Sequence, residues 1–242
     1  MALNIFKNED EVLAALADYF LDKANEAITA RGKFSVALSG GNSPKKLYEL
    51  LSASYQTQID WEKVHFFFGD ERDVPKDNKD SNYLMAKTAL FDPLEISTTN
   101  IFPVDTSLPP KEAAAAYWEA IEEYFDDNEI SFDLVLLGLG DNSHTASLFP
   151  HTPVLHDRTP GVSEVWLDDK KIFRITMNAP LINDAKNIAF LVYGEGKAEA
   201  VHHVLEDDED IEEYPAQLID SIVGEVEWFL DEAAAEDLEE KE

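Results

Sequence analysis

Short apolar segments alternate with longer amphipathic segments along most of this chain. The apolar segments are rich in β-branched and aromatic residues, which favour strands, and several of them have no polar face. Strands of that kind belong to a largely parallel sheet that helices cover on both faces. The predicted strands are FSVAL (34–38), VHFFF (64–68), FDLVLL (132–137), KIFRIT (171–176) and NIAFLVY (187–193), and the predicted helices span about 9–31, 43–54, 80–90, 110–128 and 194–206. We therefore predict an α/β fold, a three-layer α/β/α sandwich with a largely parallel central sheet.

The length of the chain fits a single domain. Its 242 residues, 45% of them hydrophobic, can bury one large core. No Gly/Ser-rich linker and no internal repeat divides them. We predict one domain over residues 1–235 and an acidic, disordered tail over residues 236–242.

The acidic side chains constrain the partners of the chain. It carries 50 Asp and Glu against 19 Lys and Arg, a formal net charge of −31. Such a field repels the phosphates of nucleic acids, so we expect no nucleic-acid partner. The acidic runs at 206–213 and 236–242 lack EF-hand spacing and are typical of a solvated surface. An excess of acid on this scale also fits adaptation to high salt.

Cysteine and long apolar segments are both missing from the sequence. Without Cys, the chain has no disulfide, no thiolate nucleophile and no cysteine-bound zinc. It contains no run of about 18 apolar residues, and its first residues are charged where a secretory signal would be apolar. We therefore expect a cytoplasmic protein with no membrane partner.

The first candidate site is a glycine-containing segment. Ligands of parallel α/β sheets bind beyond the carboxyl ends of the strands. After the predicted strand 34–38 come Ser39, Gly40, Gly41, Asn42 and Ser43, and then an amphipathic helix. Two glycines let the backbone approach an anion closely, and the helix N-terminus offers free N–H groups and a positive dipole end. The segment predicts a phosphate site, with an ordinary strand-to-helix turn as the alternative.

Polar side chains that could carry chemistry follow two further strands. Asp70 and Arg72 come after the strand 64–68, and His144 comes after the strand 132–137. An imidazole near its reference pKa of about 6.5 is mostly neutral at pH 7 and can act as a general base. The alternatives are a surface salt bridge at Asp70 and Arg72 and a structural role for His144. The other histidines lie within elements or loops without metal-ligand spacing and are weaker candidates.

Scarce cations form the last candidate group. An anionic substrate that approaches so acidic a chain needs a local positive focus. Arg72, Arg174 and Lys197 can supply it, because a charge-assisted contact to phosphate contributes about 1.5–3 kcal/mol. The alternative is that each cation pairs with a surface carboxylate.

Five segments of the chain resemble, in order and spacing, those of the 6-phosphogluconolactonase family. They are LSGGNSPKKLYELL, FFFGDERDVPKDNKDSNYLMAKTAL, DLVLLGLGDNSHTASLFP, RITMNAPLINDAKNIAFLVYGEGKAEAV and YPAQLI, across about residues 10–230. The resemblance implies the fold of glucosamine-6-phosphate isomerase. It also implies hydrolysis of 6-phospho-D-glucono-1,5-lactone to 6-phosphogluconate, a step of the oxidative pentose phosphate pathway. It makes a phosphorylated sugar lactone the small-molecule partner and implies no metal ion and no organic cofactor.

The resemblance also assigns roles to residues by their position. It makes His144 the base that activates water, and Asp70 and Asn142 are the further catalytic candidates. The residues that it places around the substrate and its phosphate are Ser39, Gly40, Gly41, Asn42, Ser43, Arg72, Arg174 and Lys197.

One departure from the family pattern falls beside His144. Family members usually read Asp-Gly-His before Thr-Ala-Ser, whereas this chain has Asn142, Ser143 and His144, with Asp141 one position earlier. A carboxylate stabilises a protonated imidazole more than a neutral amide does. Either Asn142 orients His144 with less charge stabilisation, or Asp141 takes over that role through a shifted loop.

Two other functions stay open. A glucosamine-6-phosphate isomerase/deaminase would share the phosphate site but needs further carboxylates, and the position of its Glu after the catalytic His corresponds here to Phe149. A non-catalytic sugar-phosphate-binding protein would need no base, and Asn142 fits such a role. The sequence leaves the oligomeric state open between monomer and dimer.

Overall fold

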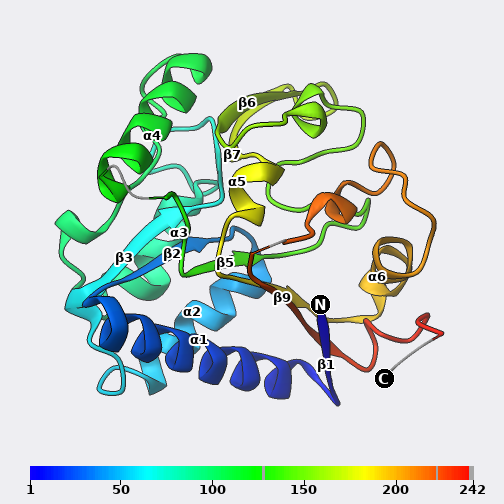
Figure 1. The fold of residues 1–242 in the computed structure, drawn as a ribbon, viewed down its shortest axis with the longest axis horizontal. Coiled ribbons are helices and arrows are strands. Elements are labelled where there is room, and N and C mark those ends of the chain that lie inside the picture. The colour runs from blue at the N-terminus through cyan, green and yellow to red at the C-terminus, as the bar shows by residue number, and fades with distance from the viewer. Residues whose placement is uncertain (127–128, 222, 240–242) are drawn as a thin grey trace.

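The computed structural model describes residues 1–126, 129–221 and 223–239. Its centre is a six-stranded sheet in the order β1-β9-β8-β5-β2-β3, in which every neighbouring pair is parallel (Figure 1). The strands are β1 (Ala2–Phe6), β2 (Phe34–Leu38), β3 (Val64–Phe68), β5 (Leu134–Leu137), β8 (Asn187–Val192) and β9 (Glu225–Asp231). Because β2, β3, β5 and β8 run in the same direction, the segments that follow them meet at one edge of the sheet.

A smaller antiparallel sheet stands beside the central one. Its order is β4-β7-β6, with β4 at Asp70–Arg72, β6 at Val162–Leu167 and β7 at Ile172–Met177. Gly69 alone separates β3 from β4 and touches both sheets: its N–H donates to the carbonyl of Leu38 at 2.9 Å, and its carbonyl accepts from the N–H of Met177 at 2.8 Å. The small sheet is therefore anchored at the carboxyl edge of the large one.

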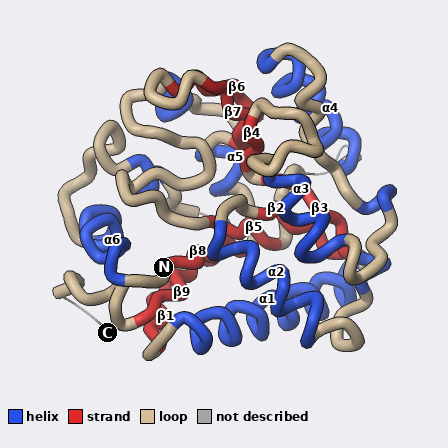
Figure 2. Tube along the Cα trace, turned by 180° about the vertical axis from the view of Figure 1, so that it is seen from behind, coloured by secondary structure: helices blue, strands red, loops and turns tan. Residues whose placement is uncertain are grey.

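Helices cover both faces of the central sheet. On one face lie α1 (Glu9–Arg31), α2 (Asn42–Ser54) and α3 (Asn82–Ala86), which continues into a π-helical turn at Lys87–Phe91; on the other lie α4 (Pro110–Phe125), α5 (Ala179–Asn183) and α6 (Ala198–Leu205) (Figures 1 and 2). Short 3-10 turns occur at Trp61–Lys63, Thr98–Asn100, Pro153–His156, Glu195–Lys197 and Pro215–Leu218. The arrangement is an α/β/α sandwich.

The ends of α1 follow from its sequence. Asn8 is the N-cap, and its side chain accepts a hydrogen bond from the N–H of Glu11 at 3.1 Å. Gly32 ends the helix in the left-handed conformation, with φ of 77°, and its N–H donates to the carbonyl of Ile28. These two residues explain why the helix begins and ends where the amphipathic pattern predicts.

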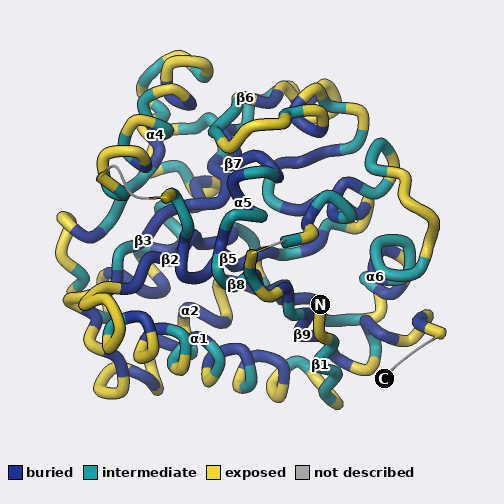
Figure 3. Tube along the Cα trace, in the orientation of Figure 1, coloured by how far each residue is buried: buried dark blue, intermediate teal, exposed yellow. Residues whose placement is uncertain are grey.

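The core has two halves, one on each face of the central sheet. The strands of that sheet are mostly buried, and exposed residues lie toward the outside of the molecule (Figure 3). The side chains of β3 contribute to both halves of the core. Phe66 and Phe68 pack with α1 and α2, whereas Phe67 packs with residues of α4 on the opposite face. Successive side chains of a strand point to opposite faces, so the phenylalanines of β3 enter both halves of the core, and only His65 is half-buried.

The predicted fold class is confirmed, and two details of the strand prediction are corrected. The segment 171–176 was expected with the other strands of the main sheet, but β7 belongs to the antiparallel sheet. Strands β1, β4, β6 and β9 were not predicted, because polar and charged residues interrupt their apolar patterns.

The helix predictions hold apart from their ends. The helix predicted over 110–128 ends at Phe125, where Asp126 has a φ of 46°, and residues 127–128 lie outside the described part of the chain. The segment predicted as the helix 194–206 forms a 3-10 turn followed by α6.

The carboxyl end of the chain packs further than expected. The disordered tail was predicted over residues 236–242, yet Leu238 is buried in the core and the N–H of Glu239 donates to the Glu206 carboxylate. Residues 240–242 lie outside the described part of the chain. No helix among the described residues is long and apolar enough to cross a membrane.

Candidate active site

A cleft of about 320 Å³ opens at the carboxyl edge of the central sheet. The segments that follow β2, β5 and β8 meet there with β4 and β7 of the small sheet. Among its lining residues are the sequence-predicted candidates Ser39, Gly40, Gly41, Asn42, Ser43, Asp70, Arg72, His144, Arg174 and Lys197. Asn142 does not line this cleft, but its side chain contacts His144.

The glycine-containing segment after β2 forms one wall. Gly41 is the N-cap of α2 with a φ of 107°, a conformation that favours glycine, and no side chain caps the first N–H groups of the helix. A Cβ on Gly40 would lie 2.1 Å from Oδ1 of Asn82, so only glycine fits there. The buried hydroxyl of Tyr48 holds the segment, since it donates to the carbonyl of Ser39 at 2.8 Å. The wall presents the positive end of α2 to the cleft.

Two arginines form a second wall of the cleft. Arg72 of β4 and Arg174 of β7 are directly opposed residues of the antiparallel pair. Nη1 of Arg72 donates to the carbonyl of Asp80 at 2.6 Å. The Nε atoms of both side chains are buried without a hydrogen-bond partner in the described part of the chain. Burial lowers the pKa of Arg174 from its usual value. Buried donors without partners are rare in folded proteins, so these two favour an anionic ligand.

Lys197 reaches the cleft from the segment after β8. It lies in the 3-10 turn Glu195–Lys197, after Gly194, whose φ of 94° turns the chain out of the strand. Its ammonium pairs with Oδ1 of Asp141, and the side chain of Lys197 is 27% exposed. Lys197 and Arg174 therefore line the same cleft rather than opposite faces of the sheet.

His144 lies in the loop after β5, with its ring held from three sides. Nδ1 contacts Oδ1 of Asn142, and the ring stacks on Phe149 with centroids 4.0 Å apart. A Cβ on Gly140 would lie 2.0 Å from Nδ1, so the imidazole occupies space that only glycine leaves free. Since Oδ1 can only accept, Nδ1 carries the proton and Nε2 keeps its lone pair.

Burial lowers the pKa of His144 to about 4. The positive charges of Lys170, Arg174 and Lys197 act in the same direction, and the nearby carboxylate of Asp70 opposes them. The ring is therefore neutral at pH 7, the form in which Nε2 can accept a proton.

Ser143, between Asn142 and His144 in the sequence, has a strained backbone conformation. It is buried and has a φ of 58°, a region that residues other than glycine seldom adopt. Its N–H donates to the carbonyl of Gly140 at 3.0 Å, and its carbonyl accepts from Ala216 at 2.9 Å. The glycine that the resembled family has here would fit this turn without strain.

Asp70 is buried in the lining of the cleft, and each of its carboxylate oxygens accepts a hydrogen bond. Its Oδ2 accepts from Oγ of Ser147 at 2.7 Å, and its Oδ1 accepts from Nδ2 of Asn82 at 3.0 Å. The sequence prediction missed both partners. Ser147 lies within the same motif as His144, which was the available signal, whereas Asn82 belongs to α3 and carries no local signal.

Lys170 was also missed. It lies in the turn between β6 and β7 and lines the cleft, with its ammonium 5.0 Å from the centre of the Phe149 ring. The scarcity of cations in this chain was the signal that could have found it.

The alternative in which Asp141 contacts His144 through a shifted loop is wrong. Its carboxylate pairs with Lys197 across the rim of the cleft, and Asn142 is the residue on Nδ1 of His144. The loop is therefore not shifted by one residue.

Comparisons with known proteins agree over almost the whole chain. Residues 7–228 match the family model described as glucosamine-6-phosphate isomerases/6-phosphogluconolactonase. The chain is 42% identical to a 6-phosphogluconolactonase of Synechocystis sp. over 221 residues, 89% of each protein, and 39% identical to one of Nostoc sp. over 240 residues, 98% of each.

Solved structures give the same result. The 6-phosphogluconolactonases of Trypanosoma cruzi and Trypanosoma brucei superpose with TM-scores of 0.87 and 0.84 at 26% and 28% identity, covering 98% of this chain and 97% and 98% of theirs. A monomeric glucosamine-6-phosphate deaminase shares the fold, with a TM-score of 0.82 at 20% identity, covering 98% of this chain and 100% of its own. The chain thus belongs to the glucosamine-6-phosphate isomerase/6-phosphogluconolactonase family.

Proposed function

We propose that this protein is a 6-phosphogluconolactonase, which hydrolyses 6-phospho-D-glucono-1,5-lactone to 6-phosphogluconate in the oxidative pentose phosphate pathway. The observation that carries the proposal is that one cleft holds a neutral, oriented imidazole together with four cations, Arg72, Lys170, Arg174 and Lys197. A base beside an anion site is what hydrolysis of a phosphorylated lactone requires. Relatives with 42% and 39% identity carry the name 6-phosphogluconolactonase.

The phosphate of the substrate is proposed to lie between the two walls of the cleft. The N-terminus of α2 offers backbone N–H groups, and Arg72, Arg174 and Lys197 offer positive charge. The unpartnered Nε atoms of both arginines would gain an acceptor there. In a chain with a net charge of −31, such a focus also draws the anion into the cleft.

The chemical step is proposed to use His144 as general base. Nε2 takes a proton from water while the water oxygen forms a bond to the lactone carbonyl carbon. When the bond from that carbon to the ring oxygen breaks, the imidazolium returns the proton to the ring oxygen. The products are a carboxyl group, which ionises, and a hydroxyl. Proton removal of this kind is typically worth about 10²–10⁴-fold in rate.

Asn142 and Asp70 are proposed to support the base in different ways. Asn142 fixes the tautomer through Nδ1 of His144. Asp70 supplies the negative charge that favours protonated His144. Its hydrogen bonds to Ser147 and Asn82 keep that carboxylate in place.

The two alternatives receive less support. A deaminase needs a carboxylate after the base, but Phe149 occupies the corresponding position and stacks on His144. A binding-only protein would have no need for a neutral imidazole in the same cleft as the cations. We also propose a cytoplasmic location, and the oligomeric state stays open.

The deciding experiment follows lactone disappearance on freshly made substrate against a blank without enzyme. The lactone also opens spontaneously, so formation of product alone proves nothing. A rate above the blank that depends on protein concentration and is lost in His144→Gln supports the proposal. A protein that binds 6-phosphogluconate but leaves the lactone at the blank rate is a binding protein instead.

A further inference from the structure

One ion pair crosses the rim of the cleft. The ammonium of Lys197 lines the proposed phosphate site, and its partner Asp141 lines a neighbouring groove with Asn142 and Trp166. The two side chains differ in exposure, since Lys197 is 27% exposed and Asp141 is 83% exposed. The carboxylate therefore approaches the cleft from the solvent side.

Lys197 differs from the two arginines of the cleft in that its charged group already has a partner. Arg72 and Arg174 each keep a buried Nε without a partner in the described part of the chain, while the ammonium of Lys197 already contacts a carboxylate. A carboxylate and a phosphate oxygen are interchangeable partners for an ammonium. An incoming phosphate that uses Lys197 must share or displace Asp141.

We propose that Asp141 is an internal competitor of the substrate phosphate, a residue that sets affinity for phosphorylated ligands by holding Lys197. This inference rests on the proposed phosphate site. Asp141 lies in a turn at the surface, where its side chain can swing into solvent once the phosphate arrives. A largely exposed ion pair is weak, so the competition lowers affinity by only about two- to fivefold.

The test measures binding of inorganic phosphate by titration calorimetry at low ionic strength. Asp141→Asn keeps the shape of the side chain and removes its charge, so we expect binding about two- to fivefold tighter. The matched control is Asp169→Asn, which removes one charge from an exposed residue of the same neighbouring groove. We expect a smaller effect there, because Asp169 does not pair with Lys197.

A double-mutant cycle tests whether Asp141 affects phosphate binding through Lys197. In a Lys197→Gln background, Asp141→Asn has no cation left to release, so its effect on phosphate binding should vanish. In the Lys197-containing protein, the effect should also shrink in about 1 M salt, because exposed charges are screened.

Four results would overturn the inference. They are weaker phosphate binding by Asp141→Asn, an equal gain in Asp169→Asn, a gain that persists in the Lys197→Gln background, and absence of phosphate binding in every variant. Wild-type protein that binds phosphate but does not hydrolyse the lactone contradicts the proposed function and leaves this inference standing, so the two failures are distinguishable.

Discussion

Arg72 and Arg174 lie directly opposite each other on β4 and β7, two like charges in a cross-strand pair. Such pairs are normally destabilising. Both Nε atoms are also buried without a partner among the described residues. A phosphate between the two guanidinium groups would offset the repulsion and satisfy both donors.

Arg174→Gln tests this pair. Loss of one charge-assisted contact worth about 1.5–3 kcal/mol should raise KM for the phosphorylated lactone by roughly 10- to 150-fold. Steady-state kinetics on the variant measures it, with Arg158→Gln as control, because Arg158 is exposed and does not line the cleft. An unchanged KM would remove Arg174 from the phosphate site.

Lys197→Ala should raise KM about tenfold with a smaller change in kcat. A contact to a phosphate remote from the reacting carbon is made equally in the ground state and the transition state, so its loss appears in KM. Lys171→Ala, which removes a lysine paired with Asp168 at the surface, is the control. A collapse of kcat at constant KM would instead place Lys197 at the reacting carbon.

His144→Gln should lower kcat by about 10²–10⁴ and still bind 6-phosphogluconate, since the phosphate contacts come from other segments. Turnover and product binding are measured on the same preparation. His156→Gln, at an exposed histidine paired with Glu212, should leave both unchanged. Turnover like that of the wild type in His144→Gln would exclude this residue as the base.

The pH dependence of kcat/KM should reflect the low pKa of His144. With a pKa of about 4, the free base stays neutral and active down to roughly that pH, so the acidic limb lies near pH 4. Asn142→Asp places a carboxylate on Nδ1 and raises the pKa, which should move the limb upward and raise kcat. The comparison is Asp141→Asn, whose limb should not move, because Asp141 contacts Lys197. A limb that moves in Asp141→Asn and not in Asn142→Asp would reverse the two assignments.

The same pKa shift should appear in stability. Between about pH 4 and pH 6.5 the unfolded chain protonates His144 and the folded chain does not, so this residue makes the free energy of unfolding rise with pH. His144→Gln should therefore flatten the dependence in that window, as denaturant unfolding at pH 4.5 and pH 7 would measure.

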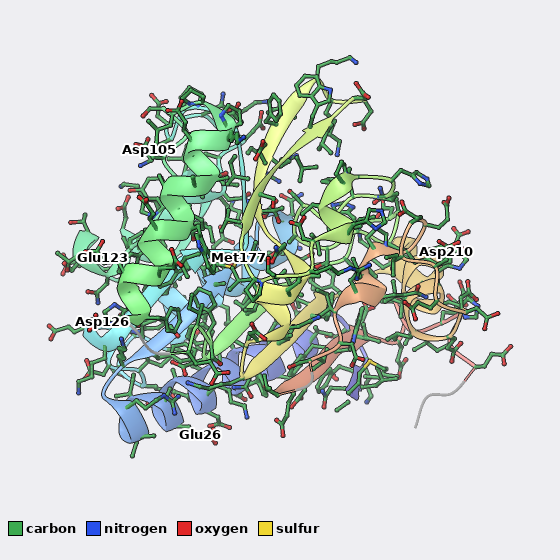
Figure 4. All side chains as sticks on the ribbon, turned by 45° about the horizontal axis from the view of Figure 1, so that its top comes forward. Glu26, Asp105, Glu123, Asp126, Met177 and Asp210 are labelled. Atoms are coloured by element: carbon green, nitrogen blue, oxygen red, sulfur yellow. The ribbon has the colours of Figure 1, made fainter. Side chains whose placement is uncertain are left out.

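Salt should stabilise the fold. The net charge is −31, and acidic residues such as Glu26, Asp105, Glu123 and Asp210 lie at the periphery of the molecule, in contrast to the interior Met177 (Figure 4). Screening of this repulsion by 1 M NaCl should raise Tm at pH 7 by about 3 °C or more. Near the pI of about 4.3 the gain should disappear. A salt effect of equal size at both pH values would point to a cause other than charge.

The local sequence pattern was sufficient to predict the strands and helix ends that have apolar runs or capping residues of their own. The segments 34–38 and 64–68 are apolar on both faces and form β2 and β3 with the predicted bounds. Asn8 begins α1 and Gly32 ends it, at the same positions where the amphipathic pattern of the sequence begins and ends. The glycines after β2 predicted a segment that lines the cleft, and the topology rule for strand ends brought it to the edge where His144 also lies.

Pairing between distant segments decided what the local pattern could not. β1 and β9 pair with each other although they are more than 200 residues apart in sequence. Polar residues interrupt the apolar pattern of both segments, so it is the pairing that makes them strands. Arg174 faces Arg72 only because β7 pairs with β4 outside the main sheet.

The chemistry of the base was likewise decided by tertiary structure. The sequence identified His144 as a candidate near the ordinary pKa of histidine, but burial and the surrounding cations lower that pKa to about 4. The choice between Asn142 and Asp141 depended on where each side chain lies, one against the imidazole and the other against Lys197. Desolvation and charge act through space from segments far apart along the chain, so neighbouring residues in the sequence cannot reveal them.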